Sequence, residues 1–136
     1  MAEFYNLRVA DIYKETEDTS VVTFEVPVHL QDAFKFRQGQ HLTLKVDINN
    51  EDVRRSYSLC SSPIENKWQV AVKLIPGGKF STYINEVLRA GDDLEVMSPS
   101  GNFGVSVKPE DAKNYLFFAA GSGITPVLSM VKTHLK

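Results

Sequence analysis

Residues 40–60 read QHLTLKVDINNEDVRRSYSLC, and this stretch contains the pattern that decides the fold class. Its first half places apolar side chains at every second position, which is typical of a strand with one buried face. These side chains are Leu42, Leu44, Val46 and Ile48. In the second half, Arg55 and Tyr57 are two residues apart, so in a strand they would share one face. The stretch predicts two strands separated by the turn residues Asn49 and Asn50.

The same alternation recurs along the rest of the chain. Candidate strands lie at residues 7–12, 21–26, 40–48, 55–60, 67–75 and 93–97. Gly, Pro, Asn and Asp punctuate the segments between them, at the spacing typical of barrels and sandwiches. One internal segment, residues 79–91, instead has apolar residues at helical spacing, with Gly91 positioned to end the helix. We therefore expect an all-β, mostly antiparallel barrel interrupted by one helix.

The composition narrows the class of protein. The chain has 136 residues, a formal net charge of −2 and a single cysteine, Cys60. This length suffices for one domain, or for one domain and part of another, and a lone cysteine suits a reduced, cytoplasmic setting. Basic residues are scattered rather than gathered into a stripe, and no apolar run reaches membrane-spanning length. We therefore expect neither nucleic acid nor a membrane as a partner.

The end of the chain has a different pattern. Residues 115–121, YLFFAAG, are apolar on both faces, as in a strand covered by helices on both sides, and a helical segment follows. Thr125 is placed to cap this helix, with Pro126 as its first residue. One strand and one helix cannot cover such a strand, so we expect a truncated second domain of the α/β type.

Two polar motifs point to a phosphate-containing ligand. In IPGGKFSTYI, Gly77 and Gly78 precede the predicted helix, where close backbone approach and unpaired N–H groups favour an anion. In RRSYS, Arg55 supplies a guanidinium for phosphate oxygens, while Tyr57 and Ser58 offer a ring face and a hydroxyl. Taken singly, the glycines are explained equally well by an ordinary turn, and RRSYS by a polar edge strand. Taken together, the motifs describe one dinucleotide-like ligand.

Four motifs occur in the order found in the ferredoxin-NADP reductase superfamily, which the whole chain resembles. They are RSYS at residues 55–58, GGKFS at 77–81, SPSGNF at 98–103 and AAGSGITP at 119–126. Within the superfamily, the chain is most similar to the reductase components of the phenylacetyl-CoA monooxygenase (epoxidase) systems of phenylacetate degradation. The resemblance implies a six-stranded antiparallel Greek-key FAD-binding barrel at residues 1–110. It also implies the first strand and helix of a truncated NAD(P)-binding α/β domain at residues 111–136.

The resemblance implies roles for individual residues as well. Arg55 would contact the FAD pyrophosphate, Tyr57 would pack on the flavin or ribityl region, and Ser58 would lie near flavin N5. Backbone groups around Val72 would face the isoalloxazine edge, and the glycine-rich turn would hold the pyrophosphate from the other side. Thr125 would contact both flavin and nicotinamide, which makes Ser58 and Thr125 the expected catalytic residues. The implied cofactor-binding residues are Arg55, Ser56, Tyr57, Ser58, Val72, Lys73, Gly77, Gly78, Lys79, Phe80, Ser81, Gly121, Ser122, Gly123 and Thr125.

The implied activity is that of a flavoprotein reductase. NAD(P)H would supply a hydride to FAD, and electrons would pass to an iron–sulfur domain or ferredoxin and then to an oxygenase component. The cysteines of a [2Fe-2S] cluster are absent from these 136 residues, so that cluster is expected only in a missing C-terminal domain, and the fragment alone is expected to turn over poorly. We expect no metal site, because His41 has no second ligand at metal-binding spacing. Two alternatives stay open: a reductase of the same superfamily serving another acceptor, and a non-enzymatic ligand-binding barrel.

Overall fold

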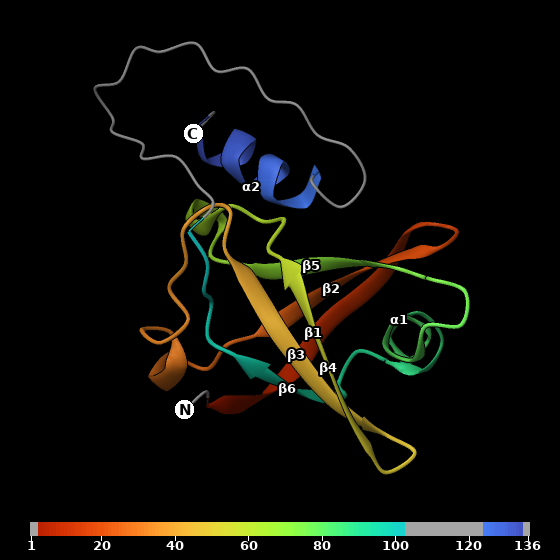
Figure 1. The fold of residues 1–136 in the computed structure, drawn as a ribbon. Helices are drawn as coiled ribbons and strands as arrows, with labels where there is room; N and C mark the ends of the chain where they lie inside the picture. The colour runs from red at the N-terminus through yellow and green to blue at the C-terminus, as the bar shows by residue number, and fades with distance from the viewer. Residues whose placement is uncertain (1–2, 103–123, 135–136) are drawn as a thin grey trace.

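The computed structural model describes residues 3–102 and 124–134, and its main feature is a six-stranded sheet closed into a barrel (Figure 1). The strands are β1 (Phe4–Thr16), β2 (Thr19–Glu25), β3 (His41–Ile48), β4 (Glu51–Ser58), β5 (Trp68–Lys73) and β6 (Asp93–Met97). The helical segments are η1 (Val28–Leu30), η2 (Pro63–Glu65), α1 (Lys79–Thr82), η3 (Tyr83–Val87) and α2 (Ile124–His134). Each predicted strand overlaps one of the observed strands, which confirms the all-β prediction for the barrel.

The strand pairs are all antiparallel, in the order β4-β3-β6-β1-β2-β5. The two ends of this order meet where the chain beyond β4 bridges β5. Leu59 pairs there with Val70, and the Cys60 N–H donates to the Gln69 carbonyl at 2.9 Å. Strands β3, β4 and β5 thus lie side by side, and β6 returns beside β3, which is the Greek-key arrangement. The predicted Greek-key barrel is confirmed.

The barrel interior is filled by alternate residues of the strands. Leu42 and Leu44 of β3 are fully buried, as their alternation predicted. Trp68 at the start of β5 is also buried, and its Nε1 donates to the Phe34 carbonyl at 2.7 Å, which satisfies the one polar atom of the ring. This packed interior fixes the positions of β4 and β5, the two strands that carry the predicted ligand contacts.

The predicted helix at residues 79–91 forms, but it is shorter and wider than expected. It begins as α1 and continues as the π-helix η3, where the Leu88 N–H donates to the Tyr83 carbonyl, five residues back, at 3.0 Å. The prediction that Gly91 ends the helix is wrong, because Leu88 already has extended backbone angles. Gly91 lies in the next turn with a φ of +96°, and its N–H donates to the Val9 carbonyl at 2.8 Å. Pairing with β1 therefore sets the position of Gly91.

The helix α2 packs against the chain segment that follows β4 (Figure 1). Its described part begins at Ile124, so Thr125 and Pro126 both lie inside the helix. The prediction of Thr125 as the cap and Pro126 as the first residue is therefore wrong. Proline is tolerated there because the N–H groups of a first helical turn have no partner within the helix. The predicted strand at residues 115–121 lies outside the described residues.

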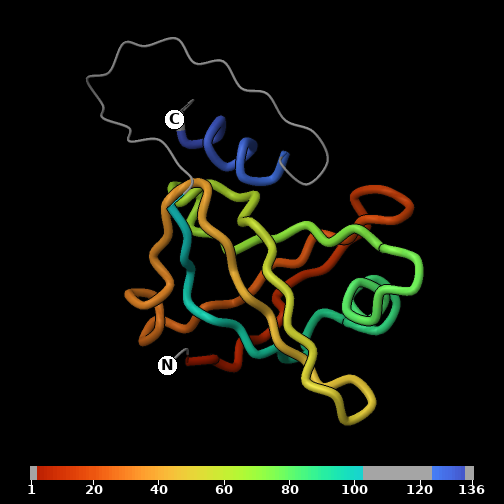
Figure 2. Tube along the Cα trace, in the orientation of Figure 1, coloured from red at the N-terminus to blue at the C-terminus, as the bar shows by residue number. Residues whose placement is uncertain are grey.

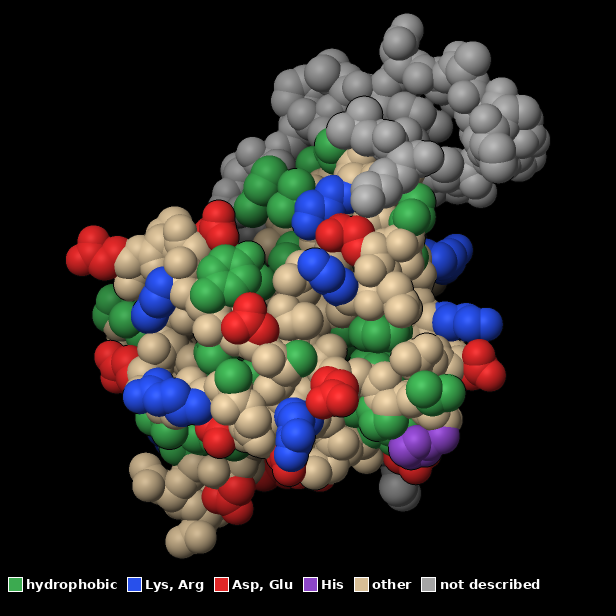
Figure 3. Space-filling view, turned by 180° about the vertical axis from the view of Figure 1, so that it is seen from behind, with side chains coloured by type: hydrophobic (Ala, Val, Ile, Leu, Met, Phe, Trp, Pro, Cys, Tyr) green, Lys and Arg blue, Asp and Glu red, His purple; other side chains and the backbone are tan. Residues whose placement is uncertain are grey.

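The outer surface carries charges of both signs. On the face seen in Figure 3, lysine and arginine side chains are interspersed with aspartate and glutamate side chains. Among residues 3–102 and 124–134, no three His, Cys, Asp or Glu side chains are grouped so that they could hold a metal ion. In the same part of the chain, no helix combines the length and the apolar character needed to cross a membrane.

Candidate functional site

The two predicted ligand-binding motifs lie side by side on the barrel. The rings of Tyr57 and Phe80 are stacked, with centroids 5.8 Å apart and an interplanar angle of 29°. Next to them, Lys79 forms an ion pair with Glu51, the first residue of β4. The chain reaches this place by leaving β5, turning, and entering α1 (Figure 2). We call the surface formed by Arg55, Tyr57 and residues 77–81 the loop face.

Arg55 and Tyr57 share one face of β4. The strand register pairs Arg55 with Leu44 and Tyr57 with Leu42, and both leucines belong to the buried core. Arg55 is exposed, whereas Tyr57 is half-buried. Burial raises the pKa of the Tyr57 phenol, and the nearby positive charge of Arg55 opposes that rise. The phenol is therefore neutral at physiological pH and presents a ring and a hydroxyl beside the guanidinium.

The two neighbouring arginines differ in how they are held. Arg54 donates from its Nε to Asp52 at 3.0 Å, and its guanidinium lies 4.9 Å from the centroid of the Phe4 ring. Arg55 donates from Nη1 to the Arg54 carbonyl at 2.6 Å. Among the described residues, Arg55 forms no ion pair with a carboxylate. The exposed guanidinium of Arg55 can therefore bind an external anion, whereas that of Arg54 is already paired with Asp52.

Ser56 and Ser58 occupy the alternate positions of β4. The Ser56 hydroxyl is exposed and shares a hydrogen bond with the Thr43 hydroxyl at 2.8 Å. Ser58 is half-buried at the end of the strand and pairs in register with His41. The chain continues directly from Ser58 into the segment that α2 covers, so Ser58 lies between the loop face and that helix along the chain.

Gly77 and Gly78 are needed for different reasons. Gly77 has a φ of +79°, which favours glycine, and a Cβ there would meet no atom within 4 Å. A Cβ at Gly78 would lie 2.8 Å from Ser81 Oγ and 3.1 Å from the Ile75 carbonyl oxygen. Ser81 is buried, and its Oγ accepts the Ile75 N–H at 3.0 Å. The Ser81 hydroxyl thus holds the turn from inside, while the backbone at Gly77 stays open to a ligand.

Val72 and Lys73 lie at the end of β5 that leads to the glycine turn. The Val72 side chain is fully buried in the core, and its carbonyl accepts a hydrogen bond from Asn85 Nδ2 at 3.1 Å. Lys73 is exposed. Only the backbone of Val72 could therefore meet a ligand, and its contact with the isoalloxazine edge stays a prediction.

Sequence reasoning missed Asn85, which supports the loop face from below. Its Nδ2 also donates to the Ser81 carbonyl at 2.9 Å, and its Oδ1 accepts from Ser20 Oγ at 2.7 Å and from Lys14 Nζ at 3.3 Å. A signal was present in the sequence, since Asn85 is a polar residue four positions after Ser81 on the buried stripe of the helix.

The remaining predicted residues lie at the C-terminal end of the chain. Thr125 is partly exposed near the start of α2. Gly121, Ser122 and Gly123 lie outside the described residues, so their role in binding a nicotinamide nucleotide stays a prediction.

The residues of the loop face fit the chemistry of FAD. An exposed guanidinium suits a pyrophosphate, a half-buried aromatic ring suits a flat heterocycle, and an open glycine backbone suits phosphate oxygens. The stacked Tyr57 and Phe80 rings place β4 beside the helical segment that follows the glycine turn.

Two curated relatives match nearly the whole chain. The chain is 48% identical over 136 residues to a subunit of the 1,2-phenylacetyl-CoA epoxidase of Escherichia coli (strain K12), a match that covers 100% of this chain and 38% of the relative. It is 40% identical over 131 residues to the ferredoxin reductase component of the 3-ketosteroid-9-alpha-monooxygenase of Rhodococcus rhodochrous, covering 95% of this chain and 36% of the relative. The chain therefore spans well under half the length of either relative.

A solved structure and a family match agree with these relatives. The fold matches phthalate dioxygenase reductase, described as a modular structure for electron transfer from pyridine nucleotides to [2Fe-2S], with a TM-score of 0.76, 31% identity, and coverage of 96% of this chain and 39% of that chain. The oxidoreductase FAD-binding domain family matches residues 6–104. The resemblance to the ferredoxin-NADP reductase superfamily is thus confirmed, and the chain belongs to the oxidoreductase FAD-binding domain family.

Proposed function

We propose that the chain is the FAD-binding module of an NAD(P)H-dependent reductase that sends electrons through an iron–sulfur centre to an oxygenase in phenylacetate degradation. The observation that carries this proposal is the stacking of Tyr57, from the motif that contains Arg55, on Phe80, from the motif that contains the glycine turn. The 48% identity to the phenylacetyl-CoA epoxidase component favours that pathway. In this proposal residues 1–110 form the FAD domain, and residues 111–136 begin the NAD(P)-binding domain.

Each residue of the loop face has a part in binding and orientation. Arg55 binds the pyrophosphate from one side, and the backbone at Gly77 and Gly78 binds it from the other. Tyr57 packs against the flavin or its ribityl chain, and Phe80 supports that ring from behind. Smaller contributions to FAD binding come from residues that border the cofactor or shape the turn. They are Ser56, Val72, Lys73, Lys79 and Ser81.

Hydride transfer depends on two further residues in this proposal. The chemistry that bound FAD supplies is the acceptance of a hydride from NAD(P)H and the release of electrons one at a time. Ser58 donates a hydrogen bond near N5, and Thr125 lies where nicotinamide and flavin meet. The turn at Gly121, Ser122 and Gly123 gives the nicotinamide nucleotide close access to the backbone.

Titration of the purified chain with FAD tests the proposal. We expect saturable binding, seen as a structured flavin absorption spectrum and a change in flavin fluorescence. Riboflavin is the matched control, because it has the same ring system but no diphosphate for Arg55 and the glycine turn. It should therefore bind much more weakly. A chain that ignores FAD would favour a non-enzymatic barrel instead.

A reductase serving another oxygenase is the second candidate. It is favoured by the 40% identity to the reductase component of the 3-ketosteroid-9-alpha-monooxygenase. The two candidates share the FAD site and differ only in the acceptor. NAD(P)H oxidation by the reductase that contains this chain, measured with the oxygenase component of each system in turn, distinguishes them.

A further inference from the structure

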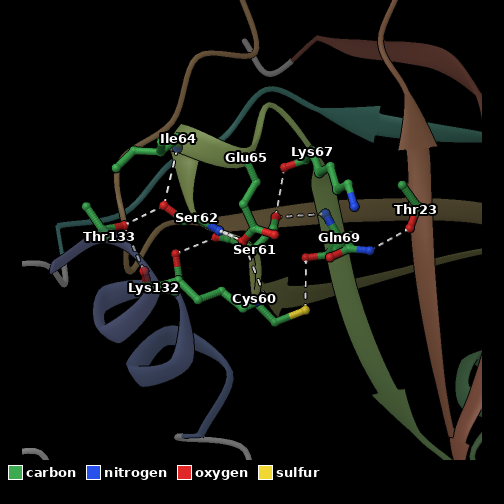
Figure 4. Close-up of polar contacts among 11 residues, drawn as sticks. Thr23, Cys60, Ser61, Ser62, Ile64, Glu65, Lys67, Gln69, Lys132 and Thr133 are labelled. Carbon is green, nitrogen blue, oxygen red and sulfur yellow. Dashed lines mark hydrogen bonds and ion pairs between the residues drawn. The ribbon is translucent and has the colours of Figure 1, made fainter. Parts of the chain in front are cut away.

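The contact between α2 and the chain segment after β4 includes buried hydroxyl groups (Figure 4). Ser129 Oγ donates to the Ser61 carbonyl at 2.6 Å, and the Ser62 and Thr133 hydroxyls are 2.9 Å apart. Ser61, Ser62 and Ser129 are 0% exposed, and Thr133 is 9% exposed. We call these four residues the hydroxyl seam.

The hydrogen bonds of the hydroxyl seam have a fixed direction. Thr133 Oγ1 donates its only proton to the Ser129 carbonyl at 2.8 Å, so it must accept in its contact with Ser62. Ser62 Oγ therefore donates to Thr133, and it accepts the Ile64 N–H at 3.2 Å. A slip of α2 along the barrel would leave the buried Ser62 proton without an acceptor, which is costly.

The seam is anchored in the barrel through further bonds. Ser61 Oγ donates to the Lys67 carbonyl at 2.8 Å and accepts the N–H of Gln69 in β5 at 3.2 Å. Beside it, Lys132 of α2 lies 3.4 Å from Glu65 Oε1, which also accepts the Ser62 N–H at 2.8 Å. The helix α2 is thus tied both to the extension of β4 and, through Ser61, to the start of β5.

The hydrogen bonds of the seam can fix the register of α2 against the barrel, which burial of apolar side chains alone cannot do. Val127 and Met130 of α2 are also buried. Burial of such side chains holds a helix to a surface, but it is non-directional and tolerates sliding. The hydroxyl seam instead specifies one register of the helix against the barrel, because Ser62 donates to Thr133 and Ser129 donates to the Ser61 carbonyl across the contact.

We propose that the hydroxyl seam sets the distance between the nicotinamide-binding and flavin-binding parts of the reductase. It fixes α2, and with it Thr125, against the continuation of the strand that carries Arg55, Tyr57 and Ser58. Ser129 and Thr133 are then positioning residues that affect hydride transfer through α2. This inference rests on the proposed function, and it assigns a role in the reaction to residues far along the chain from the flavin motif.

The test uses substitutions at Thr133 in the reductase that contains this chain. Thr133→Val keeps the shape of the side chain and removes the hydroxyl, whereas Thr133→Ser keeps the hydroxyl and should restore the native behaviour. Thr16→Val is the matched control, because it removes a hydroxyl that donates to Asp18 at 2.9 Å on an exposed turn. Three quantities are measured in each variant: amide hydrogen exchange in α2 and in β3, the FAD dissociation constant, and the rate of flavin reduction by saturating NADH or NADPH.

In Thr133→Val we expect amide exchange in α2 to rise about tenfold, as for the loss of one buried hydrogen bond. The rate of flavin reduction should fall several-fold, while the FAD dissociation constant and the exchange of β3 amides stay unchanged. Thr133→Ser and Thr16→Val should match the wild type in all three measurements.

Two results would overturn the inference. One is unchanged exchange in α2 of Thr133→Val, and the other is faster exchange with an unchanged rate of flavin reduction. Failure of the wild-type protein to bind FAD would instead refute the proposed function. The exchange data would still decide in that case whether the hydroxyl seam holds α2.

Discussion

The loop face and the hydroxyl seam lie at opposite ends of β5 and use polar groups in opposite ways. At the loop face, the guanidinium of Arg55 is exposed and the backbone at Gly77 opens to solvent. At the hydroxyl seam, the side chains of Ser62 and Ser129 are fully buried and bond to groups of the same protein. Polar groups with unused bonding capacity can bind a ligand, whereas groups that satisfy one another fix the position of an element.

The two regions also differ in what supports them. The loop face depends on buried residues beneath it, Phe80 under Tyr57 and Asn85 under the glycine turn. The residues of the hydroxyl seam bond to one another and, through Ser61, to the start of β5. Changes beneath the loop face should therefore damage stability and ligand binding together, while changes beside the seam should leave the loop face intact.

The largest effect is expected for Phe80→Ala, which tests the support of the loop face. Phe80 is 1% exposed, so its truncation should lower the free energy of unfolding by about 3–5 kcal/mol. Urea denaturation measures this loss. Val87→Ala, on the exposed side of the same helical segment, is the control and should stay within about 0.5 kcal/mol of the wild type. A similarly small loss for Phe80→Ala would contradict the supporting role of Phe80.

A smaller loss is expected for Asn85→Leu. The substitution keeps the number and branching of the side-chain heavy atoms, but the Val72 and Ser81 carbonyls and the Ser20 hydroxyl each lose a hydrogen-bond partner. Each buried polar group left without a partner costs about 1–3 kcal/mol. We therefore expect a clear fall in the free energy of unfolding together with weaker FAD binding. Ser20→Ala, which breaks only one of these bonds, should cost less. Equal losses for both variants would show that the contacts to Val72 and Ser81 are unimportant.

The smallest effect concerns the pH dependence of stability beside the hydroxyl seam. Burial raises the pKa of the Cys60 thiol, and the positive charge of Lys132 opposes the rise. Above about pH 8.5, where an ordinary thiol ionises, the unfolded chain loses a proton that the folded chain keeps. The stability contributed by the neutral thiol is thus fully present below that pH and falls as the pH rises towards the folded pKa.

Urea denaturation of the wild type and of Cys60→Ala between pH 7 and pH 10 measures this effect, over a range that flanks the pKa of about 8.5 for an ordinary thiol. The wild type should lose stability over the upper part of that range more steeply than the variant. Parallel curves would mean that the thiol is not protected by the packing of the barrel and α2.

Local patterns predicted the barrel well, because alternation is a property of neighbouring residues. Leu42 and Leu44 alternate with polar residues and are both buried in the core. The residues of the loop face could also be predicted from the sequence. Arg55 and Tyr57 are two residues apart, which places them on one face of a strand, and the paired glycines mark a turn. The chemistry of one ligand predicted that the two motifs lie close together, and Tyr57 of the first motif stacks on Phe80 of the second. Their joint contact with one ligand stays a prediction.

The features that escaped prediction depend on partners distant in the sequence. Asn85 bonds to residues of three different strands, which no local pattern contains. Gly91 takes its position from pairing with Val9 rather than from the end of the helix. Ser61 and Ser62 resemble a polar extension of β4 in the sequence, and only the packed α2 gives their hydroxyls a role.

The proposed contact between the Arg55 guanidinium and the FAD pyrophosphate is tested by a comparison of two adjacent arginines. FAD dissociation constants are measured by fluorescence titration for the wild type, Arg55→Ala and Arg54→Ala. Arg55→Ala should weaken binding about 10- to 100-fold, as for the loss of a hydrogen bond to a charged group. Arg54→Ala should bind FAD as the wild type does, because Asp52 already holds that guanidinium. Equal affinities for Arg55→Ala and the wild type would show that Arg55 does not bind the pyrophosphate.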